Sequence, residues 1–260
     1  GQFKVPFNFE ELIPDTAMQF IDRSVTNEVF SYGRDLGVTV HGGLLEKKLH
    51  YYLYAMNEGN NINTANRNNF FLWGTRVVYN VLGNHGLTSA DPGNSEEPQW
   101  MVGAAGTYNK VGQPTAADMN LFATTADTAF RYRGFSAIGA GYYLRNQSTV
   151  TNTYGFSGQA GYFILPTHLE VIARFAGVVP TTAGVTNGYE ADGGVNYYFK
   201  GHNLKILADY AVLINSPLTL GVGGAAGRGA AGNIITTGGT PGFNHGQNDH
   251  RVRLQAQVYF

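Results

Sequence analysis

The sequence contains no cysteine and few charged residues. Asp, Glu, Lys and Arg together make up 13% of its 260 residues. The lack of cysteine excludes a disulfide framework and any thiolate metal site. Charged residues are about half as frequent as is typical of soluble domains. The formal net charge of -1 at pH 7 provides no overall attraction to nucleic acid or to an anionic membrane surface.

Long apolar runs are also missing from the sequence. No stretch approaches the roughly 18 consecutive apolar residues that a transmembrane helix requires. The chain nevertheless has 35 Gly and 13% aromatic residues, and this combination with few charges makes a poor water-soluble surface. In a transmembrane β-barrel every second residue faces lipid, so the lipid-facing side never appears as a continuous run. We therefore predict an all-β fold, a transmembrane antiparallel β-barrel.

Alternation of apolar and polar residues marks the expected strands. It is clearest at the end of the chain, where Val252, Leu254, Ala256, Val258 and Phe260 alternate with Arg251, Arg253, Gln255, Gln257 and Tyr259. A soluble β-sandwich would show the same alternation. The length of the segments and their aromatic ends favour the membrane barrel. About twelve strands are expected, near 1–5, 34–42, 48–58, 69–82, 99–109, 118–133, 135–146, 153–165, 168–178, 187–200, 203–214 and 248–260.

The connections between these segments mostly alternate between short and long, as periplasmic turns and outer loops do. Segment 83–98 breaks the pattern, because it should be a turn but has about sixteen residues, and the sequence offers no reason for its length. Segment 6–33 is the first long loop. Asn8 followed by Glu11 is typical of a helix N-cap, which predicts short helical turns in a compact loop.

The opening of the chain carries specific motifs. They are "GQFKVPFNFEEL", "FIDRS" and "GRDLGVTVHG", with "VVYNVLG" at 77–83 and "VGAAGTYNK" at 102–110. These motifs resemble the phosphate-selective porin O and P family over the first 110 residues. The matching positions are Gly1, Gln2, Phe3, Lys4, Pro6, Phe7, Glu10, Arg23, Ser24, Gly33, Arg34, Asp35 and Gly37. The terminal Phe260 is similar to the ending that bacterial barrel-assembly machinery recognises.

The resemblance implies a 16-stranded channel in the bacterial outer membrane, a homotrimer in contact with lipid and lipopolysaccharide. Residues 1–260 would be a single barrel domain that begins within the fifth strand, so that about four and a half strands precede it. Segment 6–33 would be the inward-folding constriction loop, anchored by Arg34 and Asp35. The alternative is a twelve-stranded barrel in which 248–260 pairs with 1–5.

Alternate residues of a strand face opposite sides of the sheet, so the position of each charged residue relative to its apolar neighbours predicts whether it faces the pore. Ten basic side chains are expected to face inward, namely Lys4, Arg76, Arg131, Arg133, Arg145, Arg174, Lys200, Lys205, Arg251 and Arg253. Six inward acids are Asp35, Asp127, Glu170, Glu190, Asp192 and Asp209. Excess positive charge in a pore raises the local anion concentration, and the planar arginine fork suits phosphate or carboxylate. The candidate pore-lining or anion-binding residues are Lys4, Arg23, Arg76, Arg131, Arg133, Arg174, Lys205, Arg251 and Arg253.

Other charges weaken the argument for a strong anion trap. The predicted constriction loop has Glu10, Glu11, Asp15, Asp22 and Glu28 against Arg23 alone, and lysine is scarce. Arginine–acid pairs across neighbouring strands can also be purely structural. We therefore expect a general porin for the passive diffusion of small polar solutes and ions, with a mild anion preference. Phosphate selectivity is the sharper alternative.

No enzyme, cofactor or metal signature is found. "GFSGQAG" at 155–161 resembles a nucleophile elbow, but Gln159 replaces the required glycine and Ser157 lies in the middle of an expected strand. No two of the seven histidines have the i,i+4 spacing of a helical zinc motif. We therefore expect no catalysis and no nucleic-acid partner. A structural or partner-binding outer-membrane barrel without free conduction is the alternative function.

Overall fold

The computed structural model describes residues 1–57, 69–111, 118–215 and 246–260. This part of the chain is all-β, with twelve antiparallel strands in one sheet, as the alternation predicted. The strands are β1 (Gln2–Lys4), β2 (Arg34–Leu44), β3 (Leu49–Met56), β4 (Leu72–Leu82), β5 (Gln99–Val111), β6 (Met119–Tyr132), β7 (Phe135–Asn146), β8 (Thr151–Leu165), β9 (Leu169–Pro180), β10 (Gly188–Lys200), β11 (Leu204–Ile214) and β12 (Asn248–Val258). None of the helices in these ranges has the length and apolar character needed to cross a membrane.

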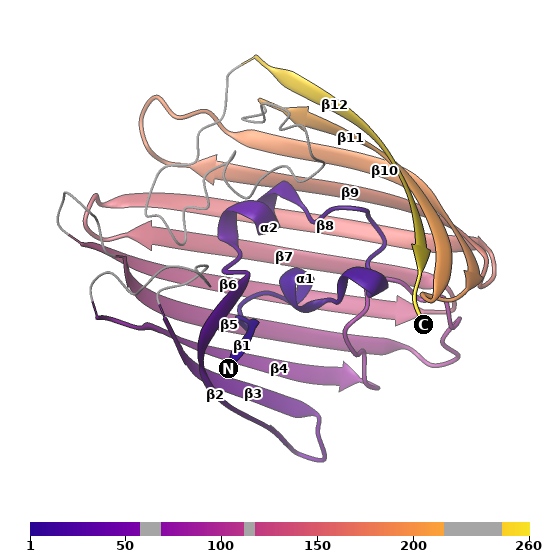
Figure 1. Cartoon of the computed structure of the whole chain (residues 1–260), viewed down its shortest axis with the longest axis horizontal. Coiled ribbons are helices and arrows are strands. Elements are labelled where there is room, and N and C mark those ends of the chain that lie inside the picture. The colour runs from indigo at the N-terminus through magenta and orange to yellow at the C-terminus, as the bar shows by residue number, and fades with distance from the viewer. Residues whose placement is uncertain (58–68, 112–117, 216–245) are drawn as a thin grey trace.

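The strands follow one another around the sheet in sequence order, from β1 to β12. Figure 1 shows the sheet curving, with β11 and β12 at one side and β2 and β3 at the other. In the described ranges, β1 pairs with β2 and β12 pairs with β11, and no hydrogen-bonded ladder joins the two edges. The pairing of 248–260 with 1–5, which the alternative twelve-stranded barrel requires, is therefore not present among the described residues.

The two faces of the sheet have the opposite arrangement from a soluble sandwich. On β12, Val252 and Leu254 are 85% and 77% exposed, whereas Gln257 is buried. On β9 and β10, Arg174, Glu190 and Asp192 are buried on the face that carries segment 6–33. The apolar side chains of these strands thus point outward, and the charged ones point toward the loop. We call these the outer face and the inner face.

Segment 6–33 forms short helices, and the first begins after Asn8, as the N-cap pattern predicted; the helix capped by Ser24 was not predicted. They are α1 (Phe9–Leu12), the 3-10 turn η1 (Asp15–Ala17) and α2 (Val25–Phe30). The Asn8 side chain accepts a hydrogen bond from the Glu11 N–H at 2.7 Å, and the Ser24 hydroxyl accepts one from Asn27 N–H at 3.1 Å. Figure 1 shows α1 and α2 lying across the strands on one side of the sheet.

Apolar packing fixes α2 against β8 and β9. Phe30 is fully buried and stacks on Tyr142 of β7, with ring centroids 5.1 Å apart. The Thr26 hydroxyl donates a hydrogen bond to the Phe156 carbonyl at 3.0 Å. Gly155 makes room for this contact, because a Cβ there would lie 2.5 Å from the Phe30 ring and 2.8 Å from Thr26 Cγ2.

The structure explains the length of segment 83–98. The Ser89 hydroxyl accepts a hydrogen bond from Gln19 N–H at 2.8 Å, and its own N–H donates to the Ala17 carbonyl at 3.2 Å. The buried Asp91 carboxylate accepts from the Gly134 N–H in the β6–β7 turn at 2.9 Å. A two-residue turn could not reach both points. Segment 83–98 therefore connects Ala17 and Gln19 of segment 6–33 to the β6–β7 turn.

The close approach at Gly155 leads to a testable prediction. Substitution Gly155→Ala should displace α2 and lower the free energy of unfolding by about 1–3 kcal/mol, the usual cost of overpacking a filled core. The matched control is Gly158→Ala on the same strand, where a Cβ would meet nothing within 4 Å. Urea unfolding of both variants in detergent measures the difference. Equal stabilities would contradict the packing described here.

Candidate pore-lining site

An arginine–carboxylate pair on the inner face holds the start of segment 6–33. Arg76 of β4 contacts Asp127 of β6 through two hydrogen bonds, Nη1 to Oδ2 at 2.8 Å and Nη2 to Oδ1 at 2.7 Å. Both side chains are fully buried. Arg76 Nη1 also donates to the Phe7 carbonyl at 2.8 Å, and Asp127 Oδ2 accepts from Phe9 N–H at 3.0 Å. A bidentate pair of this kind has strong directional preference, so it fixes where the loop meets the wall.

A second arginine organises the middle of the loop. Arg174 of β9 donates from Nε to Asp192 and from Nη2 to Glu190, each at 2.8 Å. Its Nη1 donates to the Asp22 carbonyl oxygen, also at 2.8 Å. The guanidinium lies 4.3 Å from the centroid of the Phe20 ring, which adds a cation–π contact. One buried cation thus holds two strand carboxylates and two loop residues together.

Carboxylates also stabilise the beginning of α2. Glu190 Oε2 accepts from Val25 N–H at 2.5 Å, and Glu10 accepts from Ser24 N–H at 2.6 Å and from the Ser24 hydroxyl at 2.7 Å. The first N–H groups of a helix have no partners within the helix and favour negative charge nearby. Burial raises the pKa of Glu10, while the neighbouring Arg174 opposes that shift. Glu10 of the loop and Glu190 of β10 therefore stabilise the folded form of the loop.

Strands β11 and β12 bind the far side of the loop. Arg253 donates to Asp209 at 2.5 Å and to the Asp22 carboxylate at 2.8 Å. Lys205 donates from Nζ to the Met18 carbonyl at 2.6 Å. Gln257 donates from Nε2 to the Thr16 carbonyl at 3.0 Å. These contacts connect the loop to strands that lie far from β4 in the sheet.

Lys4 of β1 and Arg23 of the loop both donate hydrogen bonds to loop oxygens. Lys4 Nζ donates to the carbonyls of Glu11 and Ile13, at 2.7 and 3.1 Å. Arg23 Nη2 donates to Asp15 at 2.7 Å and to the Ile13 carbonyl at 2.9 Å. Partial burial would raise the pKa of Asp15, but the hydrogen bond and charge of Arg23 lower it below its ordinary value. Both predicted anion ligands are thus already engaged by loop oxygens.

One buried polar cluster was missed by the sequence analysis. Gln19 donates from Nε2 to Glu170 Oε1 at 2.6 Å, and its carbonyl accepts from Asn196 Nδ2 at 2.9 Å. Tyr198 donates its hydroxyl hydrogen to Glu170 Oε2 at 2.7 Å. Parity had placed Glu170 on the inner face, but a glutamine in an irregular loop has no pattern that would reveal its partners.

Two predicted inward arginines lie elsewhere. Arg133 is exposed in the turn between β6 and β7, with φ of 47° and its guanidinium 5.2 Å from the Tyr132 ring centroid. Arg145 is exposed on the outer face of β7, because its neighbours Tyr142 and Leu144 fill the inner face. The inward placement of both residues is wrong. Lys200, which is also exposed, lies at the very end of β10.

The remaining predicted residues have mixed surroundings. Arg131 is half-buried and donates from Nε to Gln99 Oε1 at 2.7 Å, and Arg251 is half-buried on β12. Of the two predicted loop anchors, Arg34 is exposed, whereas Asp35 is buried and accepts from Leu36 N–H at 2.8 Å. The base of the loop is closed by backbone pairing of β1 with β2, which places Lys4 opposite Arg34.

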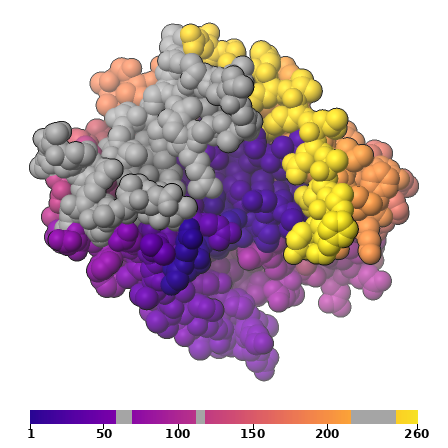
Figure 2. Space-filling view, viewed as in Figure 1, coloured from indigo at the N-terminus to yellow at the C-terminus, as the bar shows by residue number. Residues whose placement is uncertain are grey.

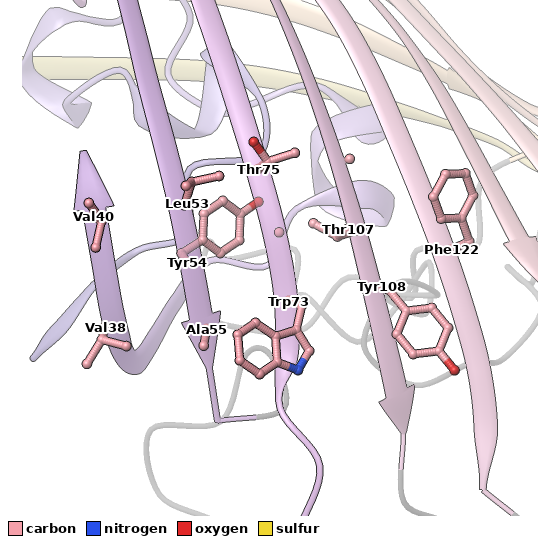
Figure 3. Close-up of a pocket in the computed structure, with 12 residues that line it drawn as sticks. Val38, Val40, Leu53, Tyr54, Ala55, Trp73, Thr75, Thr107, Tyr108 and Phe122 are labelled. Carbon is pink, nitrogen blue, oxygen red and sulfur yellow. The ribbon is translucent and has the colours of Figure 1, made fainter. Parts of the chain in front are cut away.

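The outer face contains a shallow apolar groove of about 580 Å³ over β2–β6. Figure 3 shows Trp73, Tyr108 and Phe122 spread along it, with Val38 and Val40 at one side. The groove is lined by Val38, Val40, Leu53, Tyr54, Ala55, Trp73, Gly74, Thr75, Gly106, Thr107, Tyr108 and Phe122. No charged side chain belongs to this lining, so the groove suits hydrocarbon rather than water.

Comparison with known proteins does not assign the chain to a family. No protein-family model matches the chain, and no curated protein sequence matches it. Within the residues that the structure describes, no group of three or more His, Asp or Glu side chains is arranged to hold a metal ion. The function is therefore inferred from the two faces of the sheet and from the contacts of the loop.

The buried Arg76–Asp127 pair leads to the second prediction. Substitution Arg76→Met leaves the Asp127 carboxylate buried without its counter-ion, which should lower the free energy of unfolding by about 3–5 kcal/mol. The double variant Arg76→Met, Asp127→Leu removes both charges and should recover a large part of that loss. Urea unfolding measures both variants. Arg145→Met, on the outer face, serves as a control without loss of stability. A double variant as unstable as the single one would contradict this assignment.

Proposed function

We propose that this chain forms the wall of a bacterial outer-membrane porin, a water-filled channel for the passive diffusion of small hydrophilic solutes and ions. The observation that carries the proposal is the inverted sheet, with charged side chains on the inner face and exposed apolar ones outside. Burial of apolar surface contributes about 25 cal/mol per Å², so such an outer face is unfavourable in water. A hydrocarbon environment removes that cost.

The outer face has the composition of a lipid-facing surface. Its exposed residues on β4 and β5 include Trp73, Val77, Trp100 and Tyr108, and large exposed apolar side chains continue on the other strands. Aromatic residues are typical of the two edges of a barrel's apolar band. Contacts with outer-membrane lipid and lipopolysaccharide follow from the proposal. The resemblance of the first 110 residues to the phosphate-selective porin O and P family adds the expectation of a homotrimer.

Selectivity is expected to be weak because the inner charges neutralise one another. Arg76, Arg174 and Arg253 each form ion pairs with buried carboxylates. The excess of ten basic over six acidic residues also shrinks, since Arg133 and Arg145 do not face inward. We therefore propose at most a mild anion preference. Phosphate selectivity has less support, because the strongest candidate ligands already hold carboxylates.

The alternative function is a structural or partner-binding barrel without free conduction. The observation that favours it is the amount of chain on the inner face, where segments 6–33 and 83–98 contact each other and the wall. Conduction further requires that the β1 and β12 edges be joined, to each other or through additional strands. Electrical measurement separates the two functions.

Conductance is the third prediction. The purified protein, added to a planar lipid bilayer, should produce stable conductance steps, and the reversal potential in a salt gradient should indicate a slight anion preference. Protein denatured by boiling is the control. A folded, inserted protein without steps would favour the structural alternative. Clear cation preference would contradict the charge distribution proposed for the inner face.

Lipid contact of the outer face is the fourth prediction. Leu254 and Gln255 are neighbours on β12 that face opposite sides, and Leu254 is far more exposed. Leu254→Arg should make folding into lipid bilayers less favourable by about 2–4 kcal/mol, the cost of arginine at mid-membrane depth on a lipid-facing position. Gln255→Arg should cost much less. Folding titrations in urea with lipid vesicles measure both. Equal effects would argue against a lipid-facing β12.

A further inference from the structure

A second shallow hollow lies on the outer face, over β4–β7. It has a volume of about 650 Å³ and adjoins the groove described above, because Thr75 and Gly106 line both. The surface is low here because its side chains are small. Ala104 of β5 pairs with Ala126 of β6, which in turn pairs with Gly141 of β7. The lining contains no charged side chain, so acyl chains of a lipid can pack closely against the wall.

Arg145 lies at the end of this hollow. It is exposed on the outer face, one residue before the end of β7. Tyr143, which lines the hollow, is two residues away on the same face of β7, and Phe122 of β6 lies directly opposite Arg145 in the ladder. Among the described strands β4–β9, Arg145 is the only arginine on the outer face, because the other arginines of these strands point to the inner face.

The charge of Arg145 has no counter-ion in the wall. Within the described part of the chain, no carboxylate forms an ion pair with Arg145, and the Asp118 carboxylate at the start of β6 is paired with Lys110, 3.5 Å away. An arginine on the lipid face costs about 2–4 kcal/mol at the bilayer midplane and about 0–1 kcal/mol near the headgroups. The position therefore suits a depth at which a lipid headgroup supplies the missing negative charge.

Tyrosines indicate that Arg145 lies at headgroup depth. Tyr143 donates its hydroxyl hydrogen to Asn152 at 3.1 Å, and Tyr108 donates to Asn120 at the same distance. Both asparagines lie close to strand ends, so the hydroxyl groups point away from the small residues in the middle of the strands. Tyrosine is enriched at membrane interfaces because its ring is apolar and its hydroxyl is polar. The edge of the apolar band thus lies beside Arg145.

The lengths of the connections indicate which leaflet Arg145 faces. The loops at its end of the sheet include 57–71, 112–118 and 181–187, whereas short turns at 133–134, 166–168 and 201–203 occupy the opposite end. In outer-membrane barrels the long loops are extracellular and the short turns periplasmic. Arg145 therefore faces the outer leaflet, which in a bacterial outer membrane consists of lipopolysaccharide. Its lipid anchor carries phosphate groups above several acyl chains.

We propose that Arg145 binds a phosphate group of lipopolysaccharide while acyl chains of the same molecule lie in the hollow over β4–β7. The inference rests on the outer-membrane location proposed above, and it identifies the lipid and the side chain that holds it. The planar guanidinium donates two parallel hydrogen bonds to phosphate oxygens. Binding does not depend on conduction, because no residue of the inner face takes part.

Native mass spectrometry of the protein, folded in detergent, counts bound lipid molecules directly. The protein is titrated with lipid A, the phosphorylated anchor of lipopolysaccharide, and with the same lipid after removal of its phosphates. We expect saturable binding of lipid A and binding of the dephosphorylated lipid that is weaker by at least about 10-fold, the ratio that one charge-assisted hydrogen bond provides.

Two pairs of variants provide matched controls. Arg145→Gln should weaken lipid A binding about 10-fold, whereas Arg133→Gln, at the opposite end of the sheet, should leave it unchanged. Ala126→Phe fills the hollow and should weaken binding of both lipids. Ala160→Phe places the same ring on the outer face of β8, outside the lining of the hollow, and should have little effect.

Equal affinities for the two lipids, or equal effects of Arg145→Gln and Arg133→Gln, would overturn the proposal. It is also overturned if lipid A does not bind and Ala126→Phe instead separates protein oligomers, because the hollow is then a contact between copies of the chain. Bilayer conductance of the same preparation keeps the two proposals distinguishable. Conductance steps without phosphate-dependent lipid binding would overturn this site alone. Phosphate-dependent binding without steps would support the site and favour the structural barrel.

Discussion

The structure depends on one constraint, that each charged side chain buried between the loop and the sheet must be compensated by an ion pair or by hydrogen bonds. Arg174 illustrates it, with two strand carboxylates and the Asp22 carbonyl around one guanidinium. Removing a single member of such a cluster leaves an uncompensated buried charge, which costs several kcal/mol. The loop and the wall therefore fold as one unit, and neither has a satisfied inner face without the other.

The same contacts extend across the whole sheet. Arg76 and Asp127 hold the loop at β4 and β6, while Lys205 and Gln257 hold its backbone at β11 and β12. Figure 2 shows the loop, in indigo, in the hollow between the purple strands and yellow β12. A loop bound at both sides acts as a brace for the curved sheet. The loop is therefore not expected to move independently of the sheet.

The sequence predicted the strands and most of the faces, because alternation with a period of two is a local property. It also predicted the Asn8 cap, which needs only four residues. Arg145 was misplaced because Tyr142 and Leu144 lie on one face of β7 and Tyr143 lies on the other. Both faces are therefore apolar there, and alternation does not identify the inner one. The partners of Gln19 and the path of segment 83–98 depend on residues far away in the chain, which no local pattern encodes.

The charge argument for selectivity changes once the partners are known. An arginine whose guanidinium is already paired with a carboxylate has no net charge to offer a passing anion. The pair of N–H groups that would bind the anion is also occupied. This applies to Arg76, Arg174 and Arg253, the three residues with the clearest inward position. Arg131 differs, because its hydrogen-bond partner is the neutral amide of Gln99, and the Asp91 carboxylate attracts its charge without forming an ion pair among the described residues. In the channel proposed above, an anion preference should therefore depend on cations outside the ion pairs, such as Arg131, rather than on the arginines that hold the loop.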